Sequence, residues 1–171
     1  MTEWTVTGTS TGHALSAPGH DCPCLIGKAG TIPAADKREG DMASPIGSWP
    51  LRRVFFRPDR LDPPRTALPL VPLHEGLGWC DDPGDPRYNR LVALPFAASH
   101  EEMWREDHLY DLVVELGFND DPPVAGHGSA IFLHLREAHT THTAGCVAVT
   151  RDDLLRLLAN ADAGTRLCIT A

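Results

Sequence analysis

The chain has 171 residues, of which 42% are hydrophobic, and its formal net charge is −8. This length fits one domain, which we expect to span residues 1–171, and the hydrophobic share is sufficient for a packed core. The negative charge argues against nucleic acid or an anionic membrane surface as a partner, because both normally bind basic protein faces.

No stretch approaches the roughly 18 apolar residues of a membrane helix, so no membrane insertion is predicted. The first residues lack a basic start followed by an apolar run, and no signal peptide is visible. The chain contains five cysteines. This odd number prevents complete pairing within the chain, so at least one thiol is free or paired between chains. The sequence leaves the oligomeric state unknown.

In the first half of the chain, alternating or β-rich segments predict strands at residues 4–9, 24–26 and 51–57. Gly and Pro, 15 of each, favour short strands and many turns. We expect residues 36–41 to form a charged, solvated loop. The segment SPIGSW at residues 44–49 predicts a turn that ends on an aromatic residue.

Residues 58–68 are expected to be irregular, and residues 78–90 to form one long loop of the kind that often makes lids or binding walls. A helical turn is predicted at residues 101–107. Strands are predicted at residues 109–116, 129–135 and 166–170. Thr150 and Asp153 have the spacing of a capping box and predict a helix start. The fold class is therefore mixed α/β and β-dominated, sandwich- or barrel-like, with one long C-terminal helix.

The chemistry concentrates between residues 127 and 149. His134 ends a predicted core strand, and Gly145-Cys146 opens the next apolar segment after a polar loop. A thiol becomes a good nucleophile when a nearby imidazole takes its proton. The glycine allows close approach of a carbonyl, whose oxyanion the backbone N–H groups of Gly145 and Cys146 can face. Spacing alone also fits an inert buried cysteine.

Two segments resemble the signature of the L,D-transpeptidase (YkuD-like) family. SAIFLH at residues 129–134, followed by TAGCVA at 143–148, resembles the strand-end His, loop and [Ser/Thr]-His-Gly-Cys of that family. Upstream, SPIGSW resembles its Thr-Pro-x-Gly-x-Phe segment. Ala144 replaces a common His, Leu135 replaces a common Gly, and the intervening loop is short. These departures resemble a divergent proteobacterial-type branch.

The resemblance implies a mixed-sheet catalytic fold and a peptidoglycan L,D-transpeptidase. Cys146 is the implied nucleophile, His134 its base and Gly145 a backbone oxyanion donor. The thiolate attacks the diaminopimelate carbonyl of a tetrapeptide stem, releases D-Ala and passes the acyl group to an amine, giving a 3–3 or 1–3 crosslink. No cofactor or metal is required. The implied location is periplasmic or cell-wall associated, and the implied inhibitors are carbapenems.

Several alternatives stay open. Water as acceptor would give an L,D-carboxypeptidase or amidase, and the chain can also be a non-catalytic metal- or peptidoglycan-binding module. The metal reading would use His127, His139 and His142 with His134 and Cys146, although paired Cys-x-x-Cys spacing is absent. Cys80 either borders the site or is structural. Candidates for binding stem-peptide carboxylates or amides are Tyr88, Asn89, Arg90 and Asn119.

Overall fold

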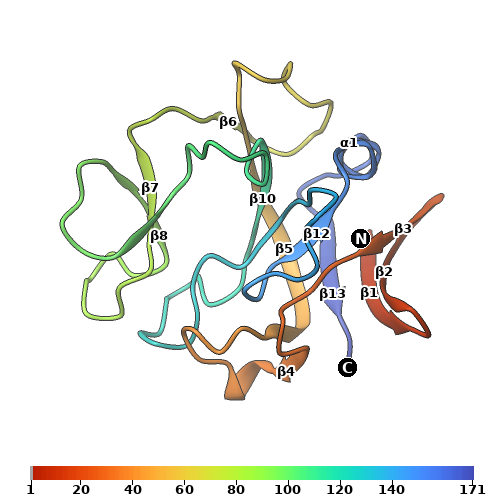
Figure 1. Ribbon diagram of the computed structural model, residues 1–171, viewed down its shortest axis with the longest axis horizontal. Coiled ribbons are helices and arrows are strands. Elements are labelled where there is room, and N and C mark those ends of the chain that lie inside the picture. Colours follow the sequence, from red (N-terminus) through yellow and green to blue (C-terminus); the bar gives the residue numbers. More distant parts are fainter. Residues whose placement is uncertain (1) are drawn as a thin grey trace.

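The computed structural model describes residues 2–171, which fold into two β-sheets with a single α-helix in that range. The larger sheet has ten strands in the described residues, and eight of them follow the order β12-β11-β10-β5-β13-β1-β2-β3. The strands β4 and β6 pair additionally with β5. The smaller sheet has the order β8-β7-β9. Figure 1 shows β7 and β8 on one side of the molecule and the N-terminal strands β1–β3 on the other.

The elements of the first half are β1 Glu3–Thr9, β2 Gly12–Ala17, β3 His20–Cys24, β4 Thr31–Pro33, a 3₁₀ helix η1 at Ala34–Asp36, β5 Ser44–Phe56, β6 Leu70–Pro72 and β7 Leu77–Cys80. Those of the second half are β8 Arg90–Ala93, β9 His100–Glu102, β10 Leu112–Leu116, β11 Phe132–Leu135, β12 Val147–Val149, α1 Arg151–Leu158 and β13 Arg166–Ile169.

The large sheet curls until its two ends meet. Just after β3, the backbone N–H of Leu25 donates to the carbonyl of Ala148 at 2.8 Å, and Ala148 donates back at 2.9 Å. This isolated bridge connects β3 to β12, the two ends of the strand order. The sheet is thus nearly closed and barrel-like, which confirms the predicted β-dominated fold class.

Side chains pack on both faces of this sheet because strand residues alternate in direction. An inner cluster includes Val54, Phe56 and Val114, whereas an outer cluster includes Phe55 and Val113. The inner cluster fills the curled sheet and takes in the buried face of α1. The outer cluster also contains Trp79 of β7, so it lies between the large sheet and the small one.

The strands at β1, β10, β11 and β13 and the irregular run before β6 confirm the predictions, with shifts of up to three residues at their ends. The helix cap is also confirmed: the Asp153 N–H donates to Thr150 Oγ1 at 3.3 Å. The prediction of a long helix was wrong, because α1 has eight residues. The strand expected at 24–26 instead ends at Cys24.

Four local predictions were wrong. Residues 44–49 are not a turn but the first half of β5, in which the ring of Trp49 packs against Gly47. Residues 78–90 are not one loop, because β7 and β8 occupy both ends. Residues 100–102 pair with β7 as β9 instead of forming a helical turn. In the charged run 36–41, Lys37 is only 2% exposed and bonds Asp41 at 2.5 Å.

Candidate active site

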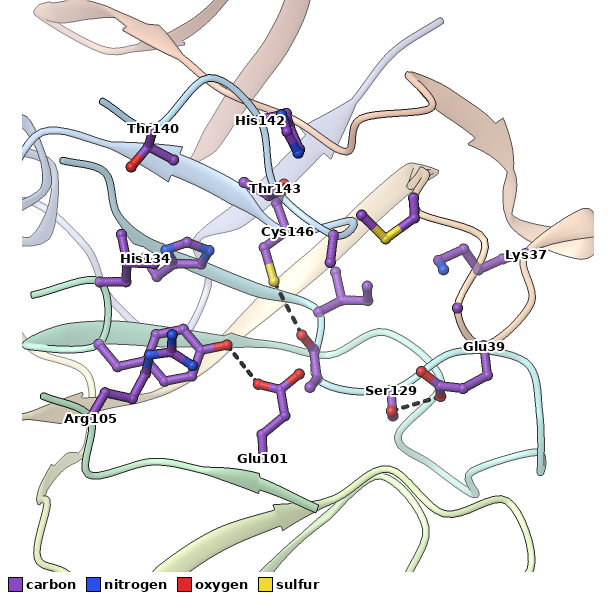
Figure 2. Close-up of a pocket in the computed structure, with 17 residues that line it drawn as sticks. Lys37, Glu39, Glu101, Arg105, Ser129, His134, Thr140, His142, Thr143 and Cys146 are labelled. Atoms are coloured by element: carbon purple, nitrogen blue, oxygen red, sulfur yellow. Dashed lines mark hydrogen bonds between the residues drawn. The ribbon is translucent and has the colours of Figure 1, made fainter. Parts of the chain in front are cut away.

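Cys146 and His134 lie on the same face of the large sheet. His134 alternates with Leu133 and Leu135, which both point into the inner cluster, so its ring faces outward. Cys146 directly precedes β12 and belongs to the outer cluster. Since β11 and β12 are parallel neighbours, with His134 opposite Ala148, the two side chains emerge beside each other. Figure 2 shows both pointing into one cavity.

The thiol of Cys146 is held by backbone groups. It donates to the carbonyl of Ala130 at 3.2 Å, and the N–H of Phe132 donates to the sulfur at 3.4 Å. Ala130 has a φ of +52°, a conformation rare for residues other than glycine. Burial raises the pKa of the Cys146 thiol to about 12. Cys146 is therefore a neutral thiol at neutral pH.

The imidazole of His134 is oriented by its own strand. Its Nδ1 lies 2.7 Å from the carbonyl of Leu135. A carbonyl only accepts hydrogen bonds, so Nδ1 carries the proton and the lone pair is on Nε2. Burial lowers the pKa of His134 to about 4. The ring of Tyr110 packs against the imidazole edge at 5.3 Å between centroids. The site thus holds a neutral imidazole that can accept a proton.

A tight turn presents Cys146, and it is closed by two hydroxyls. Thr143 Oγ1 donates to the Cys146 carbonyl at 2.6 Å and accepts from the Gly145 N–H at 3.1 Å. Ser44 Oγ donates to the Gly145 carbonyl at 2.7 Å. Gly145 has a φ of +136°, and a Cβ there would lie 2.9 Å from the Ala43 carbonyl. The SPIGSW and TAGCVA segments therefore meet at this turn, which requires glycine.

The cavity in front of Cys146 has a volume of about 520 Å³ and a mixed polar and apolar wall. This volume lies in the ordinary range of small-molecule and peptide sites. Its polar lining comes from several elements: Lys37, Glu39, Glu101, Arg105, Tyr110, Ser129, His134, Thr140, His142, Thr143 and Cys146.

Charged residues of both signs face this cavity, and the sequence analysis missed them. Glu101 of β9 accepts from the Tyr110 hydroxyl at 2.7 Å, and burial raises the pKa of this carboxyl. Arg105 bonds Asp107 at 2.6 Å and stacks near Tyr110. These residues reach the cavity only because the small sheet covers the outer face of the large one. No local sequence pattern predicts this packing of one sheet on the other.

The four residues predicted to bind substrate lie beside the cavity rather than in its wall. Tyr88 donates to Glu39 and accepts from the Gly128 N–H at 2.9 Å. Asn119 bonds Val124 and Gly128 within its own loop. Arg90, with Tyr88, lines a separate cavity of about 420 Å³.

Asn89 connects that loop to the site. Its Oδ1 accepts from Trp79 Nε1 and from the Ala130 N–H, both at 3.0 Å. Its Nδ2 donates to the carbonyls of Phe118 and Asn119, at 3.1 and 2.7 Å. All four hydrogen-bonding positions of this amide are filled. Asn89 therefore holds Ala130, whose carbonyl accepts from the thiol.

Among the described residues, the five side chains of the metal alternative do not form a cluster with metal-compatible spacing. His139 and His142 are exposed in the loop before Cys146. Within residues 2–171, the only three-residue group with metal-compatible spacing is elsewhere, at His20, Cys22 and Asp153. Cys80 is buried on β7. It does not belong to the described residues that line the Cys146 cavity.

Comparison with protein families matches residues 6–169 to the YkuD family, described as the L,D-transpeptidase catalytic domain. The chain belongs to the L,D-transpeptidase family. The match covers nearly the whole chain and includes both segments that carry the resemblance. A search of curated proteins finds no match. In the described residues of this L,D-transpeptidase family member, no helix is long and apolar enough to cross a membrane.

Proposed function

We propose that the chain is a single catalytic domain that acts as a peptidoglycan L,D-transpeptidase, with Cys146 as nucleophile and His134 as base. One observation carries the proposal: a buried thiol and an imidazole with a free Nε2 open into the same cavity. The family match supports the reaction class. The proposed place of action is the cell wall or periplasm, where this substrate occurs.

In the proposed first step, Nε2 of His134 takes the thiol proton as the sulfur attacks the diaminopimelate carbonyl of a tetrapeptide stem. The C–S bond forms, the C–N bond to D-Ala breaks, and His134 returns the proton to the leaving amine. The thioester is then attacked by an amine of another stem. His134 removes the amine proton, the C–S bond breaks and the thiol is regenerated.

The turn at residues 143–146 places the backbone near the reacting carbonyl. The Gly145 N–H is engaged by Thr143 Oγ1 in the resting state. Its proposed role as oxyanion donor therefore requires exchange of this bond for one to the substrate. Removal of one oxyanion donor in comparable sites costs about 2.7–4 kcal/mol of barrier.

The charges around the cavity suit a peptide stem. Such a stem carries carboxylates and an amine on diaminopimelate, and the wall offers Lys37 and Arg105 together with Glu39 and Glu101. Complementary charges of this kind set orientation more than raw affinity. We propose that Arg105 and Glu101, the pair nearest the Tyr110 side, orient the charged ends of the donor stem.

Carbapenem labelling followed by mass spectrometry tests the nucleophile. One adduct is expected on the wild-type protein and none on Cys146→Ala, with Cys80→Ala as a control that keeps the label. His134→Gln should acylate at least about 100-fold more slowly, the usual contribution of a general base. Persistent labelling of Cys146→Ala would refute the assignment.

Muropeptide analysis tests the reaction. Incubation with tetrapeptide stems should release D-Ala and form dimers whose linkage identifies the acceptor amine. Tripeptides without dimers would instead establish an L,D-carboxypeptidase. Intact tetrapeptides despite carbapenem labelling would contradict both activities on this substrate.

A further inference from the structure

A second cluster of reactive side chains lies away from the Cys146 cavity, where β3 meets the start of α1. His20 and Cys22 are two residues apart on β3 and so share one face of the strand. Asp153 reaches this face from the first turn of α1. The imidazole nitrogen, the sulfur and a carboxylate oxygen of the three residues all lie within 4.8 Å of one another.

We propose that His20, Cys22 and Asp153 bind one Zn²⁺ ion, with the fourth coordination position left to water. Imidazole nitrogen, thiolate and carboxylate are the ligands that zinc takes in proteins. Bond lengths of about 2.0–2.3 Å put tetrahedral ligand atoms about 3.3–3.6 Å apart. The side chains therefore need to move by about an ångström at most.

In the described part of the chain, the proposed ligand atoms of His20 and Asp153 are engaged only with each other. Asp153 Oδ2 accepts from Thr150 Oγ1 at 2.5 Å, whereas Oδ1 lies 2.9 Å from Nε2 of His20. A metal ion would replace that single histidine–aspartate hydrogen bond and keep the helix cap. The Thr150 hydroxyl then serves to orient the carboxylate, a support that metal-binding side chains commonly have.

The charges and the access also suit a cation. The carboxylates of Asp153 and Asp21 lie near Cys22 and favour a cation there, whereas Arg136 opposes it. Zinc binding would release the thiol proton of Cys22. The side chains of His20 and Asp153 are about 20% exposed, and His20 lines a cavity of about 220 Å³, so an ion can enter from solvent.

Binding is tested with Zn²⁺ on protein carrying Cys146→Ser, which removes the proposed nucleophile as a competing ligand. Isothermal titration should give one site, and the melting temperature should rise with Zn²⁺. Adding Cys22→Ala should weaken affinity by more than about 100-fold, since even supporting residues of metal sites contribute 10–100-fold. Cys24→Ala is the matched control, a buried thiol two residues further on the same strand, and should keep the affinity.

Cobalt substitution identifies the ligands independently. Co²⁺ should show a thiolate charge-transfer band and the intense visible bands of a tetrahedral ion, both lost with Cys22→Ala and weakened with His20→Ala or Asp153→Asn. Absence of a 1:1 site, or equal loss with Cys24→Ala, would overturn the proposal. Because Cys146 is absent from all these variants, the result is independent of the transpeptidase assignment.

Discussion

At the scale of single residues, the site combines a thiol and an imidazole that both resist ionisation. Burial places the pKa of Cys146 at about 12 and that of His134 at about 4. A preformed thiolate–imidazolium pair would need the opposite order of pKa values. The resting pair is therefore neutral, and in the proposed mechanism the proton moves as the sulfur attacks.

This state predicts a broad pH profile. The rate of carbapenem acylation should stay within about threefold from about pH 5 to pH 10, because His134 is neutral above about 4 and Cys146 protonated below about 12. Stopped-flow rates of carbapenem acylation, measured at constant ionic strength, test this pH profile. At pH 7 the wild type should show no more ultraviolet thiolate absorbance than Cys146→Ser. A rate that falls between pH 7 and 9 would indicate an ion pair.

The sequence identifies some of these residues and not others. The strand-end His134 and the Gly-Cys pair are visible because the family pattern is local in the chain, and both side chains line the cavity as that pattern implies. Lys37 was expected in solvent because charged runs usually are exposed, yet it is buried against Asp41. Glu101 and Tyr110 join the site through tertiary packing, which leaves no local pattern.

At the scale of elements, the loop from β10 to β11 supports the thiol of Cys146, the proposed nucleophile. Asn89 lies just before β8 and holds this loop at Phe118, Asn119 and Ala130. The Ala130 carbonyl then accepts from the thiol of Cys146. The segment between β7 and β8 therefore helps to position the Cys146 sulfur through Ala130.

Replacing Asn89 should affect both stability and reaction. Asn89→Ala leaves buried partners without hydrogen bonds, which should lower the free energy of unfolding by about 2–4 kcal/mol. Acylation should slow about tenfold or more because Ala130 shifts. Urea unfolding and carbapenem acylation rates measure the two effects.

Asn119→Ala is the control for this prediction. It removes bonds within the same loop but none to Ala130, so its acylation rate should stay near that of wild type. Equal slowing in both variants would show that general loosening of the loop, rather than the Asn89–Ala130 bond, sets the rate. A raised KM of Asn119→Ala with unchanged stability would instead support the predicted role of Asn119 in substrate binding.

Strands that alternate or are rich in Val and Leu, such as β1 and β10, can be predicted because their pattern reflects burial. The strands β7 and β9 could not, since Gly, Pro, Asp and Glu dominate their neighbourhoods and pairing stabilises them only after the chain has folded. The first half of β5 has the Pro and Gly of a turn, but its pairing with β4 and β13 keeps it extended.

At the scale of the whole molecule, stability is coupled to the protonation of the site. In the unfolded chain a histidine has a pKa near 6.5, whereas in the fold the pKa of His134 is lowered to about 4. Between these values the unfolded state binds the proton and the folded state does not. The contribution of neutral, buried His134 to the free energy of unfolding is therefore complete above pH 6.5 and decreases as the pH falls toward 4.

The difference between 6.5 and about 4 corresponds to about 3 kcal/mol of unfolding free energy. Urea titrations at several pH values should show this loss in the wild type between about pH 6.5 and 4. His134→Gln should lack this part of the loss, whereas His139→Gln, with its ring 83% exposed, should keep it. Identical pH dependence in all three proteins would contradict buried, neutral His134.

The two faces of the large sheet have different roles, one in packing and the other in the proposed chemistry. Side chains of the inner cluster stabilise the curled sheet, while the proposed nucleophile and base lie on the other face of this sheet. Volume-conserving exchanges among the inner aliphatic residues can therefore raise heat resistance while the reacting groups keep their geometry. A protein engineer can treat the interior as a tunable scaffold and the opposite surface as the place to change selectivity.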